Sequence, residues 1–349
     1  MGETTTPGGP TGTRSWITLL HGSPRGSWST RATGVEGTPL AIADDGRTTF
    51  IVYTPALQGL VENESLRIFK VPHGGRVSPS RLLDGGRRLH RGEPTSASFL
   101  WANVVARDGR WWAVWKSSYE WEEEQERGED SIFGVVGCSE FYQARSVLPA
   151  FAARKIGTGC SDSLGIGLHW RGRTALLSQT ASNGAVHLRR ANASGQFEST
   201  GVTVTGAEEF SASVTVAGGG TFVSYVDART GRLHLAQDDG RLRFTRRLIP
   251  SRGRPAGTTT YVAASGGRVF VGYDAGFKIG TPPRNTRRAY VATSGTTGPF
   301  RSREVTARFG ARNPAIEGWV TGLVAARGRA TVSFLVIPAP PNWYAARLP

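Results

Sequence analysis

Cysteine, methionine and long apolar runs are scarce in this sequence. Its 349 residues include two cysteines, Cys138 and Cys160, and one methionine. Two cysteines are too few for a cysteine-based metal site, so the pair is expected to form an extracellular disulfide, with two unrelated buried thiols as the alternative. No apolar run reaches the roughly 18 residues that a membrane span needs.

Lysine is also rare, and arginine supplies nearly all of the formal net charge of +15. A basic protein can bind anionic glycans, cell surfaces or nucleic acids, although a scattered solvated surface has the same composition. The fingerprints of nucleotide binding and of serine hydrolases are absent, and the six histidines show no metal-ligand spacing. We therefore expect no nucleotide cofactor, and nucleic acid is not the expected partner.

The N-terminal segment 1–13 lacks both the basic and the apolar region of a signal peptide. Its Thr, Gly and Pro residues predict a disordered tail. Such a tail is typical of the residues that follow a removed signal peptide, in which case Met1 is not native and the protein is extracellular.

Apolar and polar residues alternate along short segments that are separated by turns. Within residues 211–249 the segments SVTVA, TFVSYV and RLHLA are parted by GGG and DARTG, and DDGR follows them. This period-two pattern predicts short antiparallel strands and an all-β chain.

The same unit recurs along the whole chain, marked by a turn glycine and a strand-ending residue that is usually aromatic. The two lie six residues apart, or seven in the first unit: Gly46 with Tyr53, Gly109 with Trp115, Gly172 with Ser178, Gly219 with Tyr225, Gly267 with Tyr273, and Gly328 with Phe334. The shortest unit is the size of a four-stranded blade. The sequence therefore predicts a single domain, 14–349, folded as a six-bladed β-propeller.

The two ends of the chain are expected to complete one shared blade. Trp28 begins an outer strand that has no inner strands before it, whereas residues 318–337 supply inner strands without an outer one. Closing the ring with strands from both termini removes exposed sheet edges. Residues 15–22 and 342–348 both have the pattern of the third strand of this blade, and only one can take that place.

Three insertions lie between the second and third strands of their units, at 54–65, 116–130 and 275–288. In a propeller this position shares a rim with the segments that enter the innermost strands. Loops on a rigid scaffold commonly carry function, although long surface loops are also tolerated at little cost.

Carboxylates precede five of the six predicted innermost strands, so we expect them to surround one mouth of the central channel: Glu36, Glu93, Asp162, Glu209 and Glu317. Carboxylates that lie close together raise one another's pKa or bind a cation such as Ca²⁺, whereas isolated ones accept hydrogen bonds from backbone N–H groups. If the protein is a hydrolase, the catalytic candidates are Glu93, Asp162, Glu209 and Glu317, with Asp227 and Asp274 behind them.

This acidic rim also holds side chains that suit a sugar, because an aromatic ring covers a pyranose face while charged groups bind its hydroxyls. The ligand-binding candidates are Tyr119, Trp121, Asp227, Arg229, Asp274, Arg287 and Trp319. The strand-ending aromatics are instead expected to pack between blades, since their position recurs whatever loop lies beside it.

The opposite rim, formed by the turns between first and second strands, is rich in arginine: Arg47, Arg110, Arg171, Arg173, Arg268, Arg327 and Arg329. It is a candidate surface for an anionic polymer or a protein partner. Arginines that merely flank turns in an arginine-rich chain are the alternative.

A polar glycine turn before the outer strand carries a resemblance to a known family. Asp238 and Gly240 precede Phe244, and Ser194 and Gly195 precede Phe197. In these fragments and in its six units the chain resembles the sialidase-type propellers, whose Asp-box follows S-x-D-x-G-x-T-W. The resemblance implies a six-bladed β-propeller. Such sialidases use an arginine triad, a Tyr/Glu nucleophile pair and an Asp acid/base, but the innermost strands here contain no arginine, so sialidase activity is not expected.

These observations favour a secreted, noncatalytic, lectin-like propeller that recognises glycans through its acidic rim. The alternative is an exo-acting glycoside hydrolase that uses two rim carboxylates on a neutral sugar. A protein-interaction scaffold is the third hypothesis.

Overall fold

The computed structural model describes residues 2–5, 15–22, 28–55, 65–90, 93–127, 130–146, 153–156, 165–181, 183–208, 211–251, 254–255, 260–279, 284–295, 297–307, 317–337 and 342–348. The named elements in these ranges are all β-strands, and they form antiparallel sheets. The predicted all-β class is confirmed. Among the described residues no helix is long and apolar enough to cross a membrane. The chain divides into two compact units, 1–162 and 163–349, which are described in turn.

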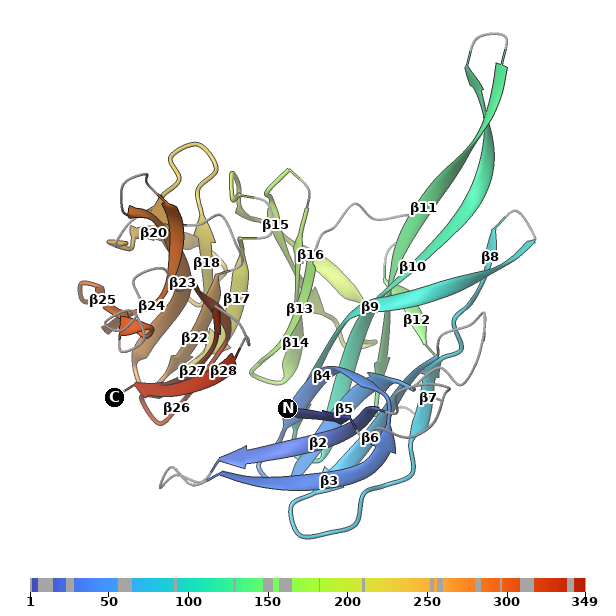
Figure 1. The fold of residues 1–349 in the computed structure, drawn as a ribbon, viewed down its shortest axis with the longest axis horizontal. Coiled ribbons are helices and arrows are strands. Elements are labelled where there is room, and N and C mark those ends of the chain that lie inside the picture. Colours follow the sequence, from blue (N-terminus) through green and yellow to red (C-terminus); the bar gives the residue numbers. More distant parts are fainter. Residues whose placement is uncertain are drawn as a thin grey trace. The chain divides into compact units, whose positions relative to one another are not determined.

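Unit 1 contains three sheets (Figure 1). The first has the order β1 (Gly2–Thr5), β2 (Ser15–Gly22), β3 (Trp28–Glu36), and the second has β4 (Thr38–Asp44), β5 (Thr48–Thr54), β6 (Leu66–Pro72), β7 (Arg81–Asp84). The third runs β12 (Arg154–Ile156), β11 (Asp130–Arg145), β10 (Arg110–Arg127), β9 (Glu93–Arg107), β8 (Arg87–His90). Consecutive sheets stack through buried apolar side chains, with Ile17 of β2 packed against Ile51, and Val52 of β5 in one core cluster with Trp115.

Unit 2 contains four sheets. Two are four-stranded meanders: β13 (Gly165–Arg171), β14 (Thr174–Thr180), β15 (Val186–Ala191), β16 (Phe197–Val204); and β17 (Ser213–Ala217), β18 (Gly220–Val226), β19 (Leu233–Asp238), β20 (Phe244–Leu248). The third has β21 (Arg254–Pro255), β22 (Tyr261–Ser265), β23 (Arg268–Ile279), β24 (Arg284–Gly295), β25 (Arg301–Glu304), and the last has β26 (Glu317–Ala326), β27 (Arg329–Ile337), β28 (Asn342–Leu348). Neighbouring sheets again share apolar clusters.

All six predicted pairs of first and second strands form antiparallel hairpins: β4–β5, β9–β10, β13–β14, β17–β18, β22–β23 and β26–β27. Each predicted turn glycine has a positive φ, between 62° at Gly172 and 88° at Gly46. In four of these turns the preceding residue also has a positive φ: Asp108, Gly218, Gly266 and Arg327. Two consecutive left-handed residues match the right-handed twist of the strands, so glycine is favoured at these positions.

The strand-ending residues are buried, as the repeat predicts. Trp115 and Phe334 are 0% exposed, and Tyr225 and Tyr273 are 1% exposed. Each stacks on a ring directly opposite it on the third strand. The pairs are Trp115 with Tyr142, Tyr225 with His234, Tyr273 with Tyr290, and Phe334 with Tyr344.

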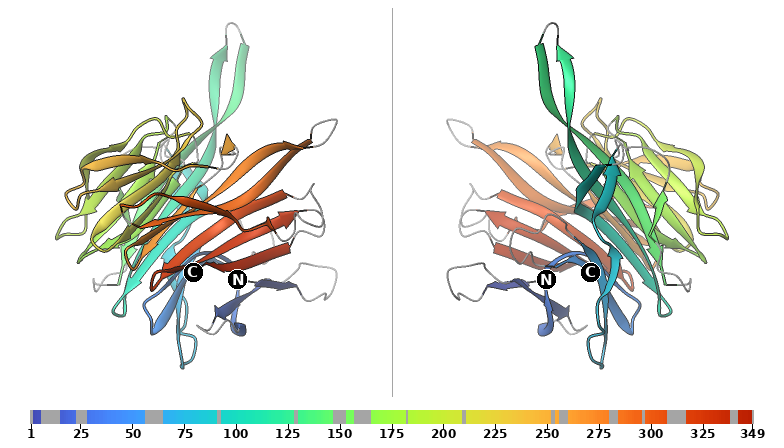
Figure 2. Two further views of the ribbon diagram at one scale, coloured as in Figure 1. Left: turned by 90° about the vertical axis from the view of Figure 1, so that its left-hand side faces the viewer. Right: turned by 90° about the vertical axis from the view of Figure 1, so that its right-hand side faces the viewer.

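Two of the predicted loop insertions are instead strand extensions. Within 116–130, the described residues lengthen the β10–β11 hairpin, which stays in register from Trp112 opposite Arg145 to Arg127 opposite Asp130 and projects beyond its sheet (Figure 2). Within 275–288, residues 275–279 and 284–288 lengthen β23 and β24 in the same way. For the described residues the interpretation as loops was wrong, because antiparallel strand pairing continues through them. Most of the third insertion, 56–64, lies outside the described residues.

The chain ends differ from the expected arrangement in part. Residues 15–22 and 342–348 are both strands, and each belongs to a three-stranded sheet of its own unit. β1 lies within the segment 1–13 that is predicted to be a disordered tail, and it pairs with β2. A single domain, a ring of six blades and a blade shared by the two termini stay predictions.

The first testable prediction concerns the buried indole of Trp115, whose Nε1–H donates to Asp84 at 2.8 Å. Trp115→Phe keeps an aromatic ring against Tyr142 but removes this donor. Since hydrogen bonds to charged groups contribute about 1.5–3 kcal/mol, we expect the free energy of unfolding in urea to fall by that amount. Trp101→Phe is the control, because Trp101 is 44% exposed. Equal losses in both variants would contradict the prediction.

Candidate functional site

The candidate site of unit 2 lies where the extended β23–β24 hairpin meets the start of β26. Arg287 belongs to the first part of β24, and Trp319 to the first part of β26. The Arg287 guanidinium carbon lies 3.9 Å from the centre of the Trp319 ring, a close cation–π contact. Two of the predicted ligand-binding residues, one from an insertion and one from a strand entrance, are therefore in contact.

Each side chain of this stack has a nitrogen atom whose hydrogen-bonding capacity is unused. Both side chains are half-buried. Arg287 Nη1 and Trp319 Nε1 are buried, and neither has a hydrogen-bond partner among the described residues. Leaving a buried donor unpaired costs about 1–3 kcal/mol. Because both atoms are buried, a ligand oxygen reaches these N–H groups only when a side chain of the stack moves.

The strand geometry adds a carboxylate to the same face. Glu317 and Trp319 are two residues apart on β26, so their side chains point to the same side of the strand. Both are half-buried, while Gly318 and Val320 between and after them are buried. We call Arg287, Glu317 and Trp319 the Arg287–Trp319 site.

The residues beneath the site fix the start of β26. A Cβ atom on Gly318 would lie 2.4 Å from Thr306 Cγ2, so only glycine allows the strand to approach this closely. The N–H of Val320 donates to Asp274 Oδ1 at 2.7 Å. Asp274 is 3% exposed, which makes it a structural acceptor between two sheets.

The neighbouring Arg288 differs from Arg287 in its charge balance. Its Nη1 lies 3.9 Å from Glu304 Oε1. Glu304 also accepts hydrogen bonds from Tyr290 at 3.4 Å and Thr306 at 3.1 Å. No ion pair joins Arg287 to a carboxylate in the described part of the chain. Of these two arginines, Arg287 is therefore the one whose charge no described carboxylate balances.

The other predicted ligand-binding residues lie elsewhere. Asp227 and Arg229 are in the exposed turn after β18, where the hydroxyl and N–H of Thr230 donate to Asp227 and lower its pKa. In unit 1, Tyr119 is 8% exposed and packs beside Trp121 and Cys138. Burial, and then the nearby Glu140, raises the pKa of Tyr119. Its ring face is not open to a sugar.

The predicted catalytic carboxylates do not form a described cluster. Glu93 lies at the β8–β9 hairpin, opposite His90, and Glu317 begins β26. Asp162 and Glu209 lie outside the described residues. The described ranges contain no group of three His, Cys, Asp or Glu side chains that suits a metal ion. The Ca²⁺ site stays a prediction.

Cys138 is disulfide-bonded, and Cys160 lies outside the described residues. In the structure Cys138 is 3% exposed beside Tyr119. Its bonding agrees with an oxidising compartment.

Unit 1 contains a buried ionic network that the sequence does not predict. Arg88 donates to both carboxylate oxygens of Asp84, at 3.0 and 2.7 Å. The guanidinium carbon of Arg88 lies 4.4 Å from the centre of the Tyr142 ring. Glu140 accepts hydrogen bonds from Lys155 and, at 2.6 Å, from Tyr142. Burial alone would raise the pKa of Asp84 and of Glu140, but these donors outweigh it and lower both. Two anions and two cations compensate one another, so the network is structural.

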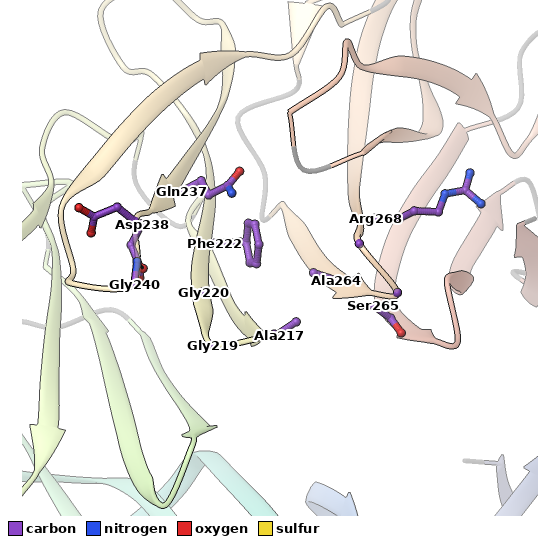
Figure 3. A pocket seen from close by; sticks show the side chains of 14 residues that line it. Ala217, Gly219, Gly220, Phe222, Gln237, Asp238, Gly240, Ala264, Ser265 and Arg268 are labelled. Atoms are coloured by element: carbon purple, nitrogen blue, oxygen red, sulfur yellow. Dashed lines mark hydrogen bonds between the residues drawn. The ribbon is translucent and has the colours of Figure 1, made fainter.

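A hollow of about 690 Å³ lies at the turn end of the β17–β18 and β22–β23 hairpins, and Figure 3 shows the residues that line it. Its walls are largely glycine backbone, with the Phe222 ring between them. Its charged side chains have other partners or point elsewhere. Asp238 lies 3.3 Å from Arg171 and accepts the N–H of Thr221, and Asp239 accepts the N–H of Arg241 at 2.8 Å. Arg268 points away from the Phe222 ring. Arg171 of the predicted arginine rim is therefore neutralised. This hollow therefore has few polar side chains that are available to bind a ligand.

Solved structures with a similar arrangement of strands are sialidases and other β-propeller proteins. Trypanosoma rangeli sialidase is 9% identical over 96% of this chain and 59% of its own, with a TM-score of 0.46. NanB sialidase from Streptococcus pneumoniae is 9% identical over 85% of this chain and 64% of its own, with a TM-score of 0.48. The β-propeller domain of the Trilobed protease from Pyrococcus furiosus is 10% identical over 89% and 85%, with a TM-score of 0.44.

This chain thus spans about three-fifths of the length of the Trypanosoma sialidase, 59% by alignment. No protein-family model and no curated protein matches the chain. At these identities and TM-scores the similarity assigns no activity to it.

The second prediction separates two aspartates that the sequence places in one class. Asp274→Ala leaves the buried N–H of Val320 without its acceptor, so we expect the free energy of unfolding to fall by about 2–3 kcal/mol. Asp227→Ala removes only contacts of an exposed turn, and we expect a loss of at most about 1 kcal/mol. Chemical denaturation of both variants is the measurement. A larger loss for Asp227→Ala would contradict the assignment of Asp274 as structural.

The third prediction concerns acid. The folded-state pKa of Glu140 is lowered, so its contribution is present above the unfolded pKa of about 4.3 and disappears as the pH falls through the folded value. Glu140→Gln should lower the free energy of unfolding by about 1.5–3 kcal/mol at pH 7. The difference from the parent protein should shrink as the pH falls below about 4, because protonated Glu140 resembles Gln. A difference that is constant from pH 7 to pH 2 would contradict this account.

Proposed function

We propose that this protein is a carbohydrate-binding β-propeller that recognises a glycan at the Arg287–Trp319 site. The observation that carries the proposal is the Arg287 guanidinium held over Trp319, with a buried N–H of each side chain unpaired. A planar guanidinium presents its donors in a fixed fork. Two vicinal sugar hydroxyls present oxygens at a matching spacing.

The composition of the site supports a sugar over an apolar ligand. Arg287 and Trp319 supply N–H donors, and Glu317 supplies carboxylate acceptors on the same face of β26. Sugar hydroxyls are both donors and acceptors, so they need both kinds of partner. The site lies on paired strands, which hold its groups in place.

The disulfide-bonded Cys138 supports an extracellular location, because disulfides persist in oxidising compartments. Cell-surface glycans and secreted polysaccharides are also found outside the cell. Extracellular location is thus part of the proposal.

Glycoside hydrolysis is the second candidate function, because Glu317 shares a strand face with Trp319 and has the half-exposed position that a catalytic carboxylate needs. Such an enzyme uses two carboxyl groups about 5–9.5 Å apart. Asp274 is a poor second carboxylate, since it is buried and holds the N–H of Val320. Binding without hydrolysis therefore ranks first.

The fourth prediction tests the binding site. A glycan array identifies the preferred oligosaccharide, and calorimetry then measures its dissociation constant for the parent protein, Arg287→Gln and Trp319→Leu. We expect each substitution to weaken binding by about tenfold or more, which is 1.4 kcal/mol. Arg232→Gln is the matched control, since Arg232 is an exposed arginine of unit 2 outside the site.

Unchanged affinity in Arg287→Gln and Trp319→Leu would overturn the site, and an array with no bound glycan would overturn the function. Release of free sugar from the bound oligosaccharide, lost in Glu317→Gln, would decide for the hydrolase instead.

A further inference from the structure

A second polar hollow of unit 2 lies away from the Arg287–Trp319 site, along β24 and β25. It has a volume of about 330 Å³, and its charged lining residues are Arg268, Arg301 and Arg303. Thr293 adds a hydroxyl group on the face of Arg301, and no carboxylate is among its described lining residues. We call these residues the arginine hollow.

Strand geometry directs two of the guanidinium groups to the same side. Arg301 lies opposite Thr293 and Arg303 opposite Val291 in the β24–β25 pairing. Residues two apart on a strand share a face, and β25 is the last strand of its sheet. Both arginines are exposed, and neither makes an ion pair with a described residue.

The intervening side chains of β25 are engaged on the other face. Ser302 donates to the carbonyl oxygen of Pro250 at 2.9 Å. Glu304 accepts hydrogen bonds from Tyr290 and Thr306. The carboxylate nearest in sequence to Arg303 is therefore committed elsewhere and does not neutralise the hollow.

The back of the hollow is held in place by further contacts. Arg268 donates to the carbonyl oxygen of Gly328 at 3.2 Å and lies 5.4 Å from the centre of the Phe270 ring. Arg247 donates to Ser294 Oγ at 3.1 Å and lies 4.8 Å from the centre of the Phe300 ring. The first pair of contacts orients the Arg268 guanidinium before any ligand binds, and the second pair fixes the adjoining part of β24.

We propose that the arginine hollow binds a tetrahedral oxyanion, as a sulfate or phosphate group carried by a ligand. Three guanidinium groups with no described carboxylate beside them repel one another, and an anion between them removes that repulsion while accepting charge-assisted hydrogen bonds. The volume accommodates such a group together with part of the ring that bears it. Arg171 and Asp238 show the contrast, since there the protein supplies its own anion.

Calorimetry at constant ionic strength tests this proposal with four probes: inorganic sulfate, inorganic phosphate, a sulfated disaccharide and the same disaccharide without sulfate. The parent protein is compared with Arg301→Gln/Arg303→Gln. The control is Arg241→Gln/Arg243→Gln, which removes two exposed arginines of the same spacing from the same unit. Thermal unfolding of both variants verifies that they are folded.

The fifth prediction is saturable binding of the sulfated disaccharide or of the inorganic anions, weakened about tenfold or more in Arg301→Gln/Arg303→Gln and unchanged in the control. Tighter binding of the sulfated disaccharide than of inorganic sulfate identifies a sulfated sugar as the source of the group. The reverse order identifies the free anion. Binding of the unsulfated disaccharide with equal affinity, equal losses in both double variants, or no binding of any probe would overturn the proposal.

Discussion

The tight turn between the first two strands of each hairpin is the constraint on which the rest of this structure depends. Its glycine takes a left-handed conformation, and in four of the six turns the residue before it does so too. This geometry fixes the pairing register of the strands that follow. The residue six or seven positions after the glycine is then always buried, from Tyr53 in unit 1 to Phe334 in unit 2. A slip of one residue would turn that side chain to the other face of its strand, which is also buried, and would separate it from its partner on the third strand.

Because the turn end of each hairpin is fixed, extra residues lengthen the opposite end. The β10–β11 and β23–β24 extensions arise in this way. Arg287 lies on the second extension and reaches Trp319 at the start of the next sheet. The site is thus a consequence of register, since the same hairpin that buries Tyr273 carries Arg287 to its place. Charge then separates the arginines that we propose to bind ligands from those paired within the protein: Arg171 and Arg288 face carboxylates, whereas Arg287, Arg301 and Arg303 make no ion pair with a described residue.

Much of this fold can be predicted from the sequence because its determinants are local. Alternation of apolar residues and turn glycines identify the six hairpins, and their common position identifies the buried aromatics. The shared rim of Arg287 and Trp319 follows from the same repeat, but their stacking does not, since it depends on the approach of β24 to β26. The roles of Asp274 and of the Asp84–Arg88 pair were missed for a similar reason. Their partners, Val320 and Trp115, are 46 and 31 residues away, and no local pattern marks such contacts. The sequence predicts loops at 116–130 and 275–288, because polar strands that project from a sheet lose the apolar alternation.

We propose that a glycan contacts the indole of Trp319, whose Nε1–H is unpaired in the described structure. Nitrogen-15 NMR of the tryptophan indoles measures this contact, with Trp319 assigned as the signal missing from Trp319→Phe. On titration with an oligosaccharide that binds, we expect a saturable shift of this signal, larger than that of the indole of Trp101. A shift confined to other indoles, with Trp319 unmoved at saturation, would contradict it.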